Sequence, residues 1–249
     1  FFNSCSELGC ACNGGWIIDI VDFYKSTSYA IPWSNTNAQW QDQDGNCGGN
    51  VDCNAIDKSE HYHIKSCEAT TLDTSSLTNP EIVAAIKTVL NQGKALAFGF
   101  FMAHGDNWSN FIQYWTQENE STYFDISEFE GLEFDASGAG HEVVCVGYTD
   151  NAWIMLNSWG TVPGLRPNGL FAVGPIDGMN YKAQVYDNGA PIDMFYWDMV
   201  DAEFSPHLPL SSIPVALALL IAGAACCLRS GKKLQETLVV RLSSRVARR

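Results

Sequence analysis

Basic residues are scarce in most of this chain. Residues 1–228 hold 7 Lys and Arg against 27 Asp and Glu, a net charge of −20, whereas residues 229–249 hold 7 Lys and Arg against one Glu, a net charge of +6. Nucleic-acid binding needs a basic surface that can meet phosphates. The acidic body of the chain therefore excludes nucleic acid as a partner, and the basic tail is a separate segment.

The chain also lacks an initiator Met and a secretory signal. Phe1-Phe2-Asn3-Ser4-Cys5 contains no charged start followed by an apolar run. We therefore expect the sequence to be part of a longer protein. Its 249 residues are enough for one large domain or two small ones with a buried core.

Cysteines are distributed unevenly, since six of the nine lie within the first 67 residues among Gly, Asn and Asp. Such a cluster is typical of a disulfide-stapled, loop-rich region in an oxidising, extracytoplasmic compartment, and the pairing stays open. The alternative is a zinc site built from Cys47, Cys53, His61, His63 and Cys67. Their spacing contains no tight CxxC pair, and the calcium-like start at 42–45 breaks off at once, so we predict no metal.

The pattern of apolar residues places several elements. Asn79-Pro80-Glu81 combines a cap residue, a first-turn proline and an acid, which predicts a helix start. Residues 26–70 are predicted to be loop-rich. Residues 103–139 form a long aromatic, acidic insertion, in which we expect the part outside a short helix to frame a cleft. The other predicted elements are a helix at 15–25, a buried strand at 95–101, a short helix at 108–116 and a last edge strand at 194–204.

Two apolar runs, 140–148 and 152–160, flank the turn-forming Thr149-Asp150-Asn151 and predict a β-hairpin. Facing residues of an antiparallel pair have numbers that add to a constant, here about 298 to 300 for a turn near 149 or 150. His141 and Asn157 add to 298, so we expect their side chains almost opposite each other, about 5 Å apart. The amide would fix the tautomer of the imidazole and orient its other nitrogen.

The run GHEVVCVGY at 140–148, followed by WIMLNSWGT at 153–161, resembles the histidine and asparagine segments of papain-family cysteine peptidases. Cys12-Asn13-Gly14-Gly15 resembles the CNGG turn of that family, in the same order. The resemblance covers about residues 1–204. It implies an α+β, papain-like cysteine proteinase fold, with an incomplete helical subdomain and an antiparallel β-rich subdomain.

The resemblance also implies residue roles. His141 would act as base and acid toward a cysteine thiolate, Asn157 would orient it, and Trp159 would shield their hydrogen bond from water. Gly14 and Gly15 would let the backbone of an extended substrate approach closely. No cofactor is implied, and the expected partners are protein or peptide substrates and a propeptide or inhibitor.

Two further points concern the substrate and the nucleophile. Glu142 falls where family members line the main specificity pocket, and a carboxylate there would favour a basic or polar substrate side chain. The family places its nucleophile in a Gln-Gly-x-Cys-Gly-Ser-Cys-Trp segment, which this chain does not contain. Cys12 is not assigned that role, because it belongs to CNGG, which follows the nucleophile in the family.

We therefore expect the C-terminal part of a cysteine endopeptidase, inactive by itself. The alternative is a non-catalytic papain-like binding domain at the cell surface. A third hypothesis is a sugar-binding surface made by the aromatic residues of 103–139.

The C-terminal part of the chain changes in composition. Ile213–Leu228 carries no charge over sixteen residues, and Arg229-Ser230-Gly231-Lys232-Lys233 follows as a basic flank. A membrane-spanning helix needs about 20 residues, and the flank agrees with the positive-inside rule. The alternatives are a sorting tail or an end unrelated to the fold.

The predicted organisation is a peptidase domain at 1–204, a linker at 205–212, a transmembrane segment at 213–228 and a basic tail at 229–249. The membrane would thus be a partner, and the protein would be anchored at the cell surface or secreted.

Overall fold

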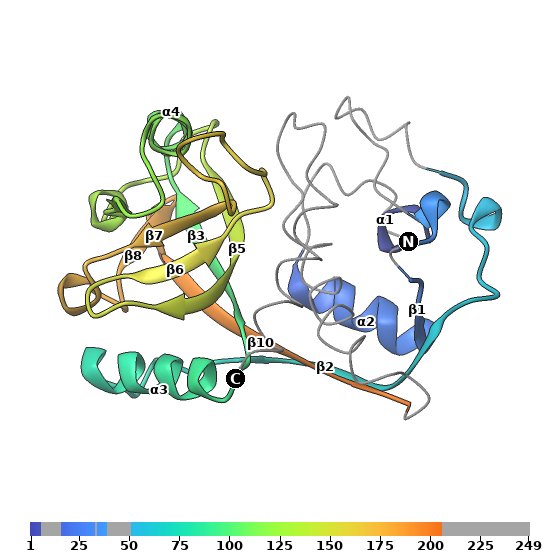
Figure 1. The fold of residues 1–249 in the computed structure, drawn as a ribbon. Coiled ribbons are helices and arrows are strands. Elements are labelled where there is room, and N and C mark those ends of the chain that lie inside the picture. Colours follow the sequence, from blue (N-terminus) through green and yellow to red (C-terminus); the bar gives the residue numbers. More distant parts are fainter. Residues whose placement is uncertain (6–15, 33, 39–50, 206–249) are drawn as a thin grey trace. The chain divides into compact units, whose positions relative to one another are not determined.

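The structure is a computed structural model that describes residues 1–5, 16–32, 34–38 and 51–205 (Figure 1). Its α-helices are α1 (Phe2–Cys5), α2 (Ile17–Thr27), α3 (Asn79–Asn91) and α4 (Gly105–Gln117). The short 3-10 helices are η2 (Thr36–Ala38), η3 (Cys53–Ala55), η4 (Ser127–Phe129) and η5 (Ile176–Gly178). The strands are β1 (Tyr29–Ala30), β2 (Tyr62–Thr71), β3 (Leu96–Met102), β4 (Tyr123–Phe124), β5 (Ala139–Tyr148), β6 (Trp153–Leu156), β7 (Leu170–Val173), β8 (Gln184–Asp187), β9 (Ala190–Asp193) and β10 (Phe195–Phe204).

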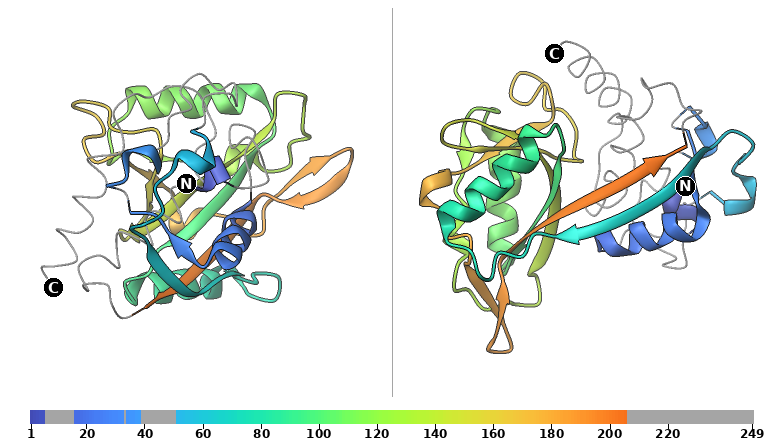
Figure 2. Two further views of the ribbon diagram at one scale, coloured as in Figure 1. Left: turned by 90° about the vertical axis from the view of Figure 1, so that its right-hand side faces the viewer. Right: turned by 90° about the horizontal axis from the view of Figure 1, so that it is seen from below.

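Eight strands form one sheet in the order β1-β2-β10-β3-β5-β6-β7-β4. Strands β8 and β9 form a separate hairpin, drawn in orange in Figure 2. Pairing is antiparallel from β10 through β7, whereas β4 lies parallel to β7. The chain divides into two compact units, 1–70 with 200–249 and 71–199. Strand β10 continues from the second unit into the first.

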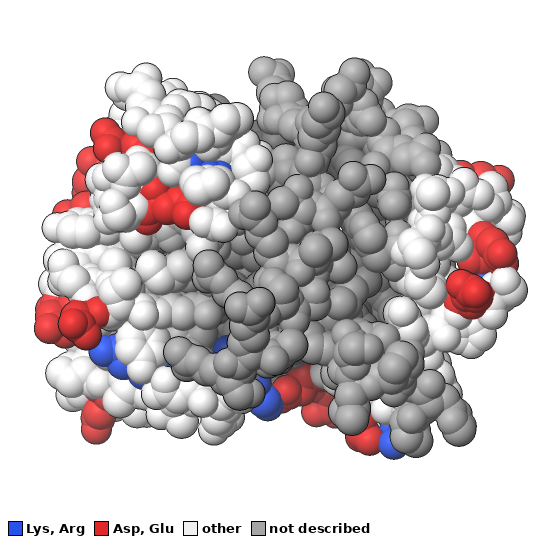
Figure 3. Space-filling view, in the orientation of Figure 1, with Lys and Arg blue, Asp and Glu red and all other residues white. Residues whose placement is uncertain are grey.

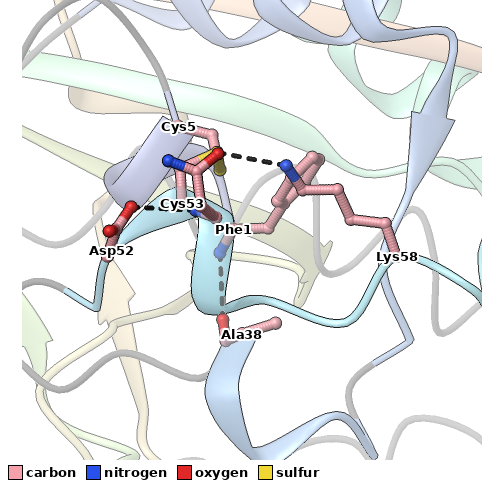
Figure 4. The surroundings of a disulfide bond; sticks show 7 residues. Phe1, Cys5, Ala38, Asp52, Cys53 and Lys58 are labelled. Carbon is pink, nitrogen blue, oxygen red and sulfur yellow. Dashed lines mark hydrogen bonds between the residues drawn. A yellow bond between two sulfur atoms is a disulfide. The ribbon is translucent and has the colours of Figure 1, made fainter.

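The first unit contains α2 and the strands β1 and β2. Helix α2 buries one stripe of side chains at helical spacing, namely Ile17, Ile20, Val21 and Tyr24. A disulfide joins Cys5 to Cys53 across a sequence separation of 48, with Phe1 and Lys58 beside it (Figure 4). The predicted disulfide stapling of the cysteine-rich region is therefore present for this pair, which also removes Cys53 from any zinc site.

The second unit holds an aromatic core around β3, β5 and β6. Helix α3 begins with a capping box, in which the backbone N–H of Thr78 donates to the Glu81 carboxylate at 2.8 Å. It buries Ile82 and Ile86 against that core. Between the strands, Gly99 has no Cβ, and the ring of Tyr196 fills the space where one would stand.

The predicted fold class is wrong. The structure is a mixed α/β fold with one eight-stranded sheet, rather than a papain-like incomplete helical subdomain with a separate antiparallel β-rich subdomain. The main reason is Tyr62–Thr71, which lies in the region predicted to be loop-rich but forms a ten-residue strand next to β10. For the same reason β10, predicted at the edge of the sheet, lies inside it.

The predicted transmembrane helix is likewise not found among the residues that the structure describes. Within the described ranges, no helix is long and apolar enough to cross a membrane. The segment 213–228 to which the prediction referred lies outside the described residues, as do the basic tail at 229–249 and almost all of the predicted linker.

Other predicted elements are confirmed with shifted boundaries. The helices expected at 15–25, after Asn79 and at 108–116 are α2, α3 and α4, and the strand expected at 95–101 is β3. The cap of α3 is Thr78 rather than Asn79. In the insertion, several aromatic side chains contribute to the core, since Phe111, Trp115 and Phe129 are buried. They are not available for the sugar-binding surface considered from the sequence.

The described surface is acidic. On the face drawn in Figure 3, Asp and Glu side chains are more widespread than Lys and Arg. A salt bridge joins Lys65 to Glu203 at 2.8 Å, between β2 and β10. Both partners are exposed, so this pair contributes little to stability.

Candidate functional site

His141 lies in the second unit, in the middle of its sheet. It belongs to β5 and pairs with Phe100 of β3 on one side. Only 4% of its surface is exposed. Because successive residues of a strand point to opposite faces, the side chains of His141 and Glu142 lie on different faces of the sheet.

Asn157 directly follows β6 and reaches back to His141. Val144 pairs with Leu156, so the numbers of facing residues add to 300 on this side of a β-bulge between Cys145 and Gly147. The two side chains therefore meet diagonally, with Nε2 of His141 3.2 Å from Oδ1 of Asn157. The predicted hydrogen bond is present and the sum of 300 lies within the predicted range, although His141 and Asn157 are offset diagonally and do not face each other directly.

This hydrogen bond sets the tautomer of His141. An amide oxygen only accepts, so Nε2 donates its N–H and Nδ1 carries the lone pair of the neutral ring. Among the described residues, none forms a hydrogen bond with Nδ1. The atom that can accept or donate a proton in a reaction is therefore Nδ1.

The loop after β6 holds Asn157 through its backbone. The N–H of Asn157 donates to the carbonyl oxygen of Gly169 at 3.1 Å. Gly169 has a φ of +68°, and a Cβ there would lie 2.8 Å from the carbonyl oxygen of Gly160. Both facts require glycine at this position, so the loop geometry that presents Asn157 depends on it.

Aromatic rings surround His141. The ring centroids of Trp159, Trp108, Phe111 and Phe100 lie 5.1, 5.4, 5.5 and 5.6 Å from that of the imidazole. Trp159 lies where the resemblance implied a shield, but three further rings contribute. The His141–Asn157 hydrogen bond is thus enclosed by apolar surface that keeps water away.

This enclosure has an electrostatic consequence. Burial lowers the pKa of His141 to about 4, and the hydrogen bond with Asn157 acts in the opposite direction. The imidazole is therefore neutral at pH 7 and able to accept a proton. A negative charge placed beside Nδ1 would favour the protonated form, since an opposite charge stabilises an imidazolium.

Two buried donors near His141 have no acceptor. Within the described part of the chain, neither Nδ2 of Asn157 nor Nε1 of Trp159 has a hydrogen-bond partner. Each such donor costs about 1–3 kcal/mol. Unsatisfied buried groups of this kind are uncommon in folded proteins and gather at functional sites.

Glu142 is also buried, with 9% of its surface exposed. Its Oε1 has no hydrogen-bond partner among the described residues. Burial, with a smaller repulsion from Asp198, raises the pKa of the Glu142 carboxyl to about 7. Asp198 itself accepts a hydrogen bond from Oγ1 of Thr71 at 2.6 Å. The two acids lie on the sheet face opposite to His141, together with Tyr196.

Three of the residues singled out from the sequence cannot be placed. Gly14, Gly15 and Cys12 lie outside the described residues. The structure therefore brings together His141, Asn157 and Trp159 from the predicted set, and it places Glu142 one residue away on the other face.

Sequence reasoning missed the contribution of α4 to the site. Trp108, Phe111 and Trp115 follow one another at spacings of three and four, which is the spacing of a single helix face. That pattern could have indicated that the three rings pack against the same part of the protein. Arg166, which is completely buried beside α4, gave no signal, because it lies in a loop rich in Gly and Pro.

No metal centre accompanies the site in the described ranges, where no three His, Cys, Asp or Glu side chains are grouped to hold an ion. Cys67 and Cys145 are buried free thiols, and burial raises the pKa of both. Neither is suited to act as a thiolate nucleophile. Comparison of the chain with protein-family models, with curated proteins and with solved structures finds no match in any of the three.

Proposed function

We propose that this chain supplies the histidine and asparagine of a cysteine peptidase that acts on proteins or peptides, and that it is related to the papain family. The observation that supports the proposal is the buried hydrogen bond of 3.2 Å between Nε2 of His141 and Oδ1 of Asn157. It orients the imidazole, leaves Nδ1 for a proton, and lies beneath Trp159. This arrangement is what a thiol nucleophile needs from its base.

In the proposed reaction, Nδ1 of His141 takes the proton of a cysteine thiol. The thiolate attacks the carbonyl carbon of the peptide bond, and the imidazolium then gives the proton to the leaving amine. Water afterwards hydrolyses the thioester, again with His141 as base. The thiol belongs to a segment outside these 249 residues, so we expect the chain by itself to be inactive.

The low pKa of His141 fits this role. Without a thiolate, burial keeps the imidazole neutral. A thiolate beside Nδ1 stabilises the imidazolium and so raises the pKa of His141, against the effect of burial. The ion pair would then exist only when both partners are present.

For the substrate, we propose a preference for a basic side chain next to Glu142. A buried carboxyl group whose Oε1 has no hydrogen-bond partner in the described part of the chain gains most from a cation that pairs with it. The test is to measure cleavage of peptides that carry Arg, Leu or Phe at the corresponding position. A preference for Leu would refute the proposal. We also propose an extracytoplasmic location, which the Cys5–Cys53 disulfide favours.

The decisive experiment uses the full-length protein. Cleavage of fluorogenic peptides is measured for the wild type and for His141→Ala and Asn157→Ala, with Asp150→Asn in the exposed hairpin turn as a control. Loss of a general base lowers kcat about 10²–10⁴-fold, and Asp150→Asn should leave kcat unchanged. A peptide carrying a thiol-reactive epoxide should label one cysteine in the wild type. No cleavage and no labelling would refute the peptidase and favour a non-catalytic binding domain.

A further inference from the structure

Arg166 is a buried cation. Its side chain is completely buried, and no carboxylate in the described part of the chain forms an ion pair with it. An isolated buried charge is strongly unfavourable unless other groups replace the lost water. Its neighbours therefore reveal what the residue is used for.

The guanidinium donates three hydrogen bonds to backbone carbonyl groups of α4 and β7. Nε donates to the carbonyl oxygen of Trp115 at 2.8 Å, and Nη2 donates to that of Tyr114 at 3.0 Å. Nη1 donates to the carbonyl oxygen of Leu170, at the start of β7, at 2.9 Å. Tyr114 and Trp115 belong to the last turn of α4, where a positive charge is favoured. The carbonyl of Tyr114 also accepts from the backbone N–H of Glu118 at 3.0 Å. Arg166 thus binds the loop after Asn157 to the end of α4.

The same guanidinium lies over two aromatic rings. Its central carbon is 4.4 Å from the ring centroid of Tyr114 and 4.9 Å from that of Trp115. These cation–π contacts compensate part of the charge. The planar guanidinium is suited to stacking and to several simultaneous hydrogen bonds, which an ammonium group cannot provide in the same way.

A continuous series of ring contacts leads from Arg166 to the site. Trp115 contacts Trp159 with ring centroids 5.9 Å apart, and Trp159 contacts His141 at 5.1 Å. Phe111, one turn earlier in α4, contacts both Trp159 and His141. Three of the four rings that enclose the His141–Asn157 hydrogen bond, those of Trp159, Trp108 and Phe111, thus come from the loop after Asn157 and from α4, which Arg166 joins.

We infer that Arg166 is a positioning residue of the proposed peptidase site, which holds Trp159 and α4 over the His141–Asn157 hydrogen bond. Its meaning for catalysis rests on the proposed function, but its effect on the environment of His141 does not. Its hydrogen bonds and cation–π contacts do not involve His141 or Asn157, so it acts through the rings between them.

A second contact in the same loop offers a matched control. The Glu120 carboxylate accepts from the backbone N–H of Asn168 at 2.7 Å and from its Nδ2 at 2.8 Å. It also accepts from the N–H of Leu170 at 3.3 Å. Glu120→Gln therefore weakens the same loop without removing the cation that lies between the loop and the aromatic rings of α4.

The test is an NMR titration of the His141 imidazole in the 249-residue chain, assigned with His141→Gln. In Arg166→Met, water should reach the ring, and the pKa of His141 should rise from about 4 toward its ordinary value, by at least about tenfold in proton affinity. Arg166→Lys keeps the charge but loses the planar group, and should give a smaller rise. Glu120→Gln should lower the melting temperature and leave the titration of His141 unchanged.

Two results would overturn the inference. One is a folded Arg166→Met, judged by circular dichroism, in which His141 titrates as in the wild type. The other is a Glu120→Gln variant that moves the titration as far as Arg166→Met does. If Arg166→Met does not fold, the same comparison between Arg166→Lys and Glu120→Gln decides. Because the titration needs no activity, a full-length protein without peptidase activity would refute the proposed function and leave this inference standing.

Discussion

Replacing Glu142 by Gln should change how the stability of the protein depends on pH. In the folded chain the Glu142 carboxyl keeps its proton up to about pH 7, whereas in the unfolded chain it releases it near pH 4.5. The folded state therefore binds more protons between these values, and its stability falls as the pH rises through them. The difference between the two pKa values corresponds to roughly 3 kcal/mol, at 1.36 kcal/mol for each tenfold change in proton affinity.

His141, the preceding residue, contributes with the opposite sign. The unfolded chain protonates it below about pH 6.5 and the folded chain only below about pH 4. Its contribution to stability therefore rises with pH across that window, also by roughly 3 kcal/mol. In the wild type the two contributions nearly cancel between pH 4.5 and 6.5. Removing the carboxyl should reveal the rise that His141 produces.

The assay is urea unfolding followed by Trp fluorescence at several pH values. The free energy of unfolding of Glu142→Gln minus that of the wild type should grow from under about 1 kcal/mol at pH 5 to about 3 kcal/mol at pH 8. Other titrating groups cancel in this difference. Asp150→Asn, in the exposed turn of the same hairpin, should give a difference that stays near zero. A difference for Glu142→Gln that does not vary with pH would refute the reasoning.

Three further predictions concern other parts of the structure. Asn157→Asp places a carboxylate beside Nε2 of His141. The pKa of His141 should then rise from about 4 to above its ordinary value, because an opposite charge stabilises the imidazolium. An unchanged imidazole titration by NMR would contradict this. Gly99→Ala should destabilise the protein by about 1–3 kcal/mol in urea unfolding, since its Cβ would overlap the ring of Tyr196, whereas Gly147→Ala meets no atom within 4 Å and should cost little. Reducing the disulfide of the first unit, which spans a sequence separation of 48, should cost about 4 kcal/mol, and equal melting curves of the oxidised and reduced protein would exclude this.

Elements with strong local signals could be predicted from the sequence. Helix α3 has a proline and an acid in its first turn, and the apolar runs of β5 and β6 flank a turn. The meeting of His141 and Asn157 followed from that hairpin alone. These signals are local, so they do not depend on knowing the rest of the fold.

The arrangement of the sheet could not be predicted in the same way. In β2 the buried residues are Ile64 and Cys67, three positions apart, so the alternation that identifies a strand is absent. Because β2 was not predicted, nothing in the sequence indicated that β10 has a neighbouring strand on both sides. Arg166 was missed for a different reason, because a lone arginine in a Gly- and Pro-rich loop is ordinarily exposed.

The β-bulge between Cys145 and Gly147 separates the two ends of the hairpin. On its outer side Tyr148 pairs with Trp153, one step out of phase with the pairing of Val144 and Leu156 on the inner side. Thr149, Asp150 and Asn151 are exposed beyond it. A spin label or a short tag inserted in this turn is separated from His141 by the bulge. The bulge can absorb a change in strand pairing at the turn, so the register of β5 at His141 is kept. The turn is accordingly the place in the hairpin where a reporter can be attached while His141 keeps its face of the sheet.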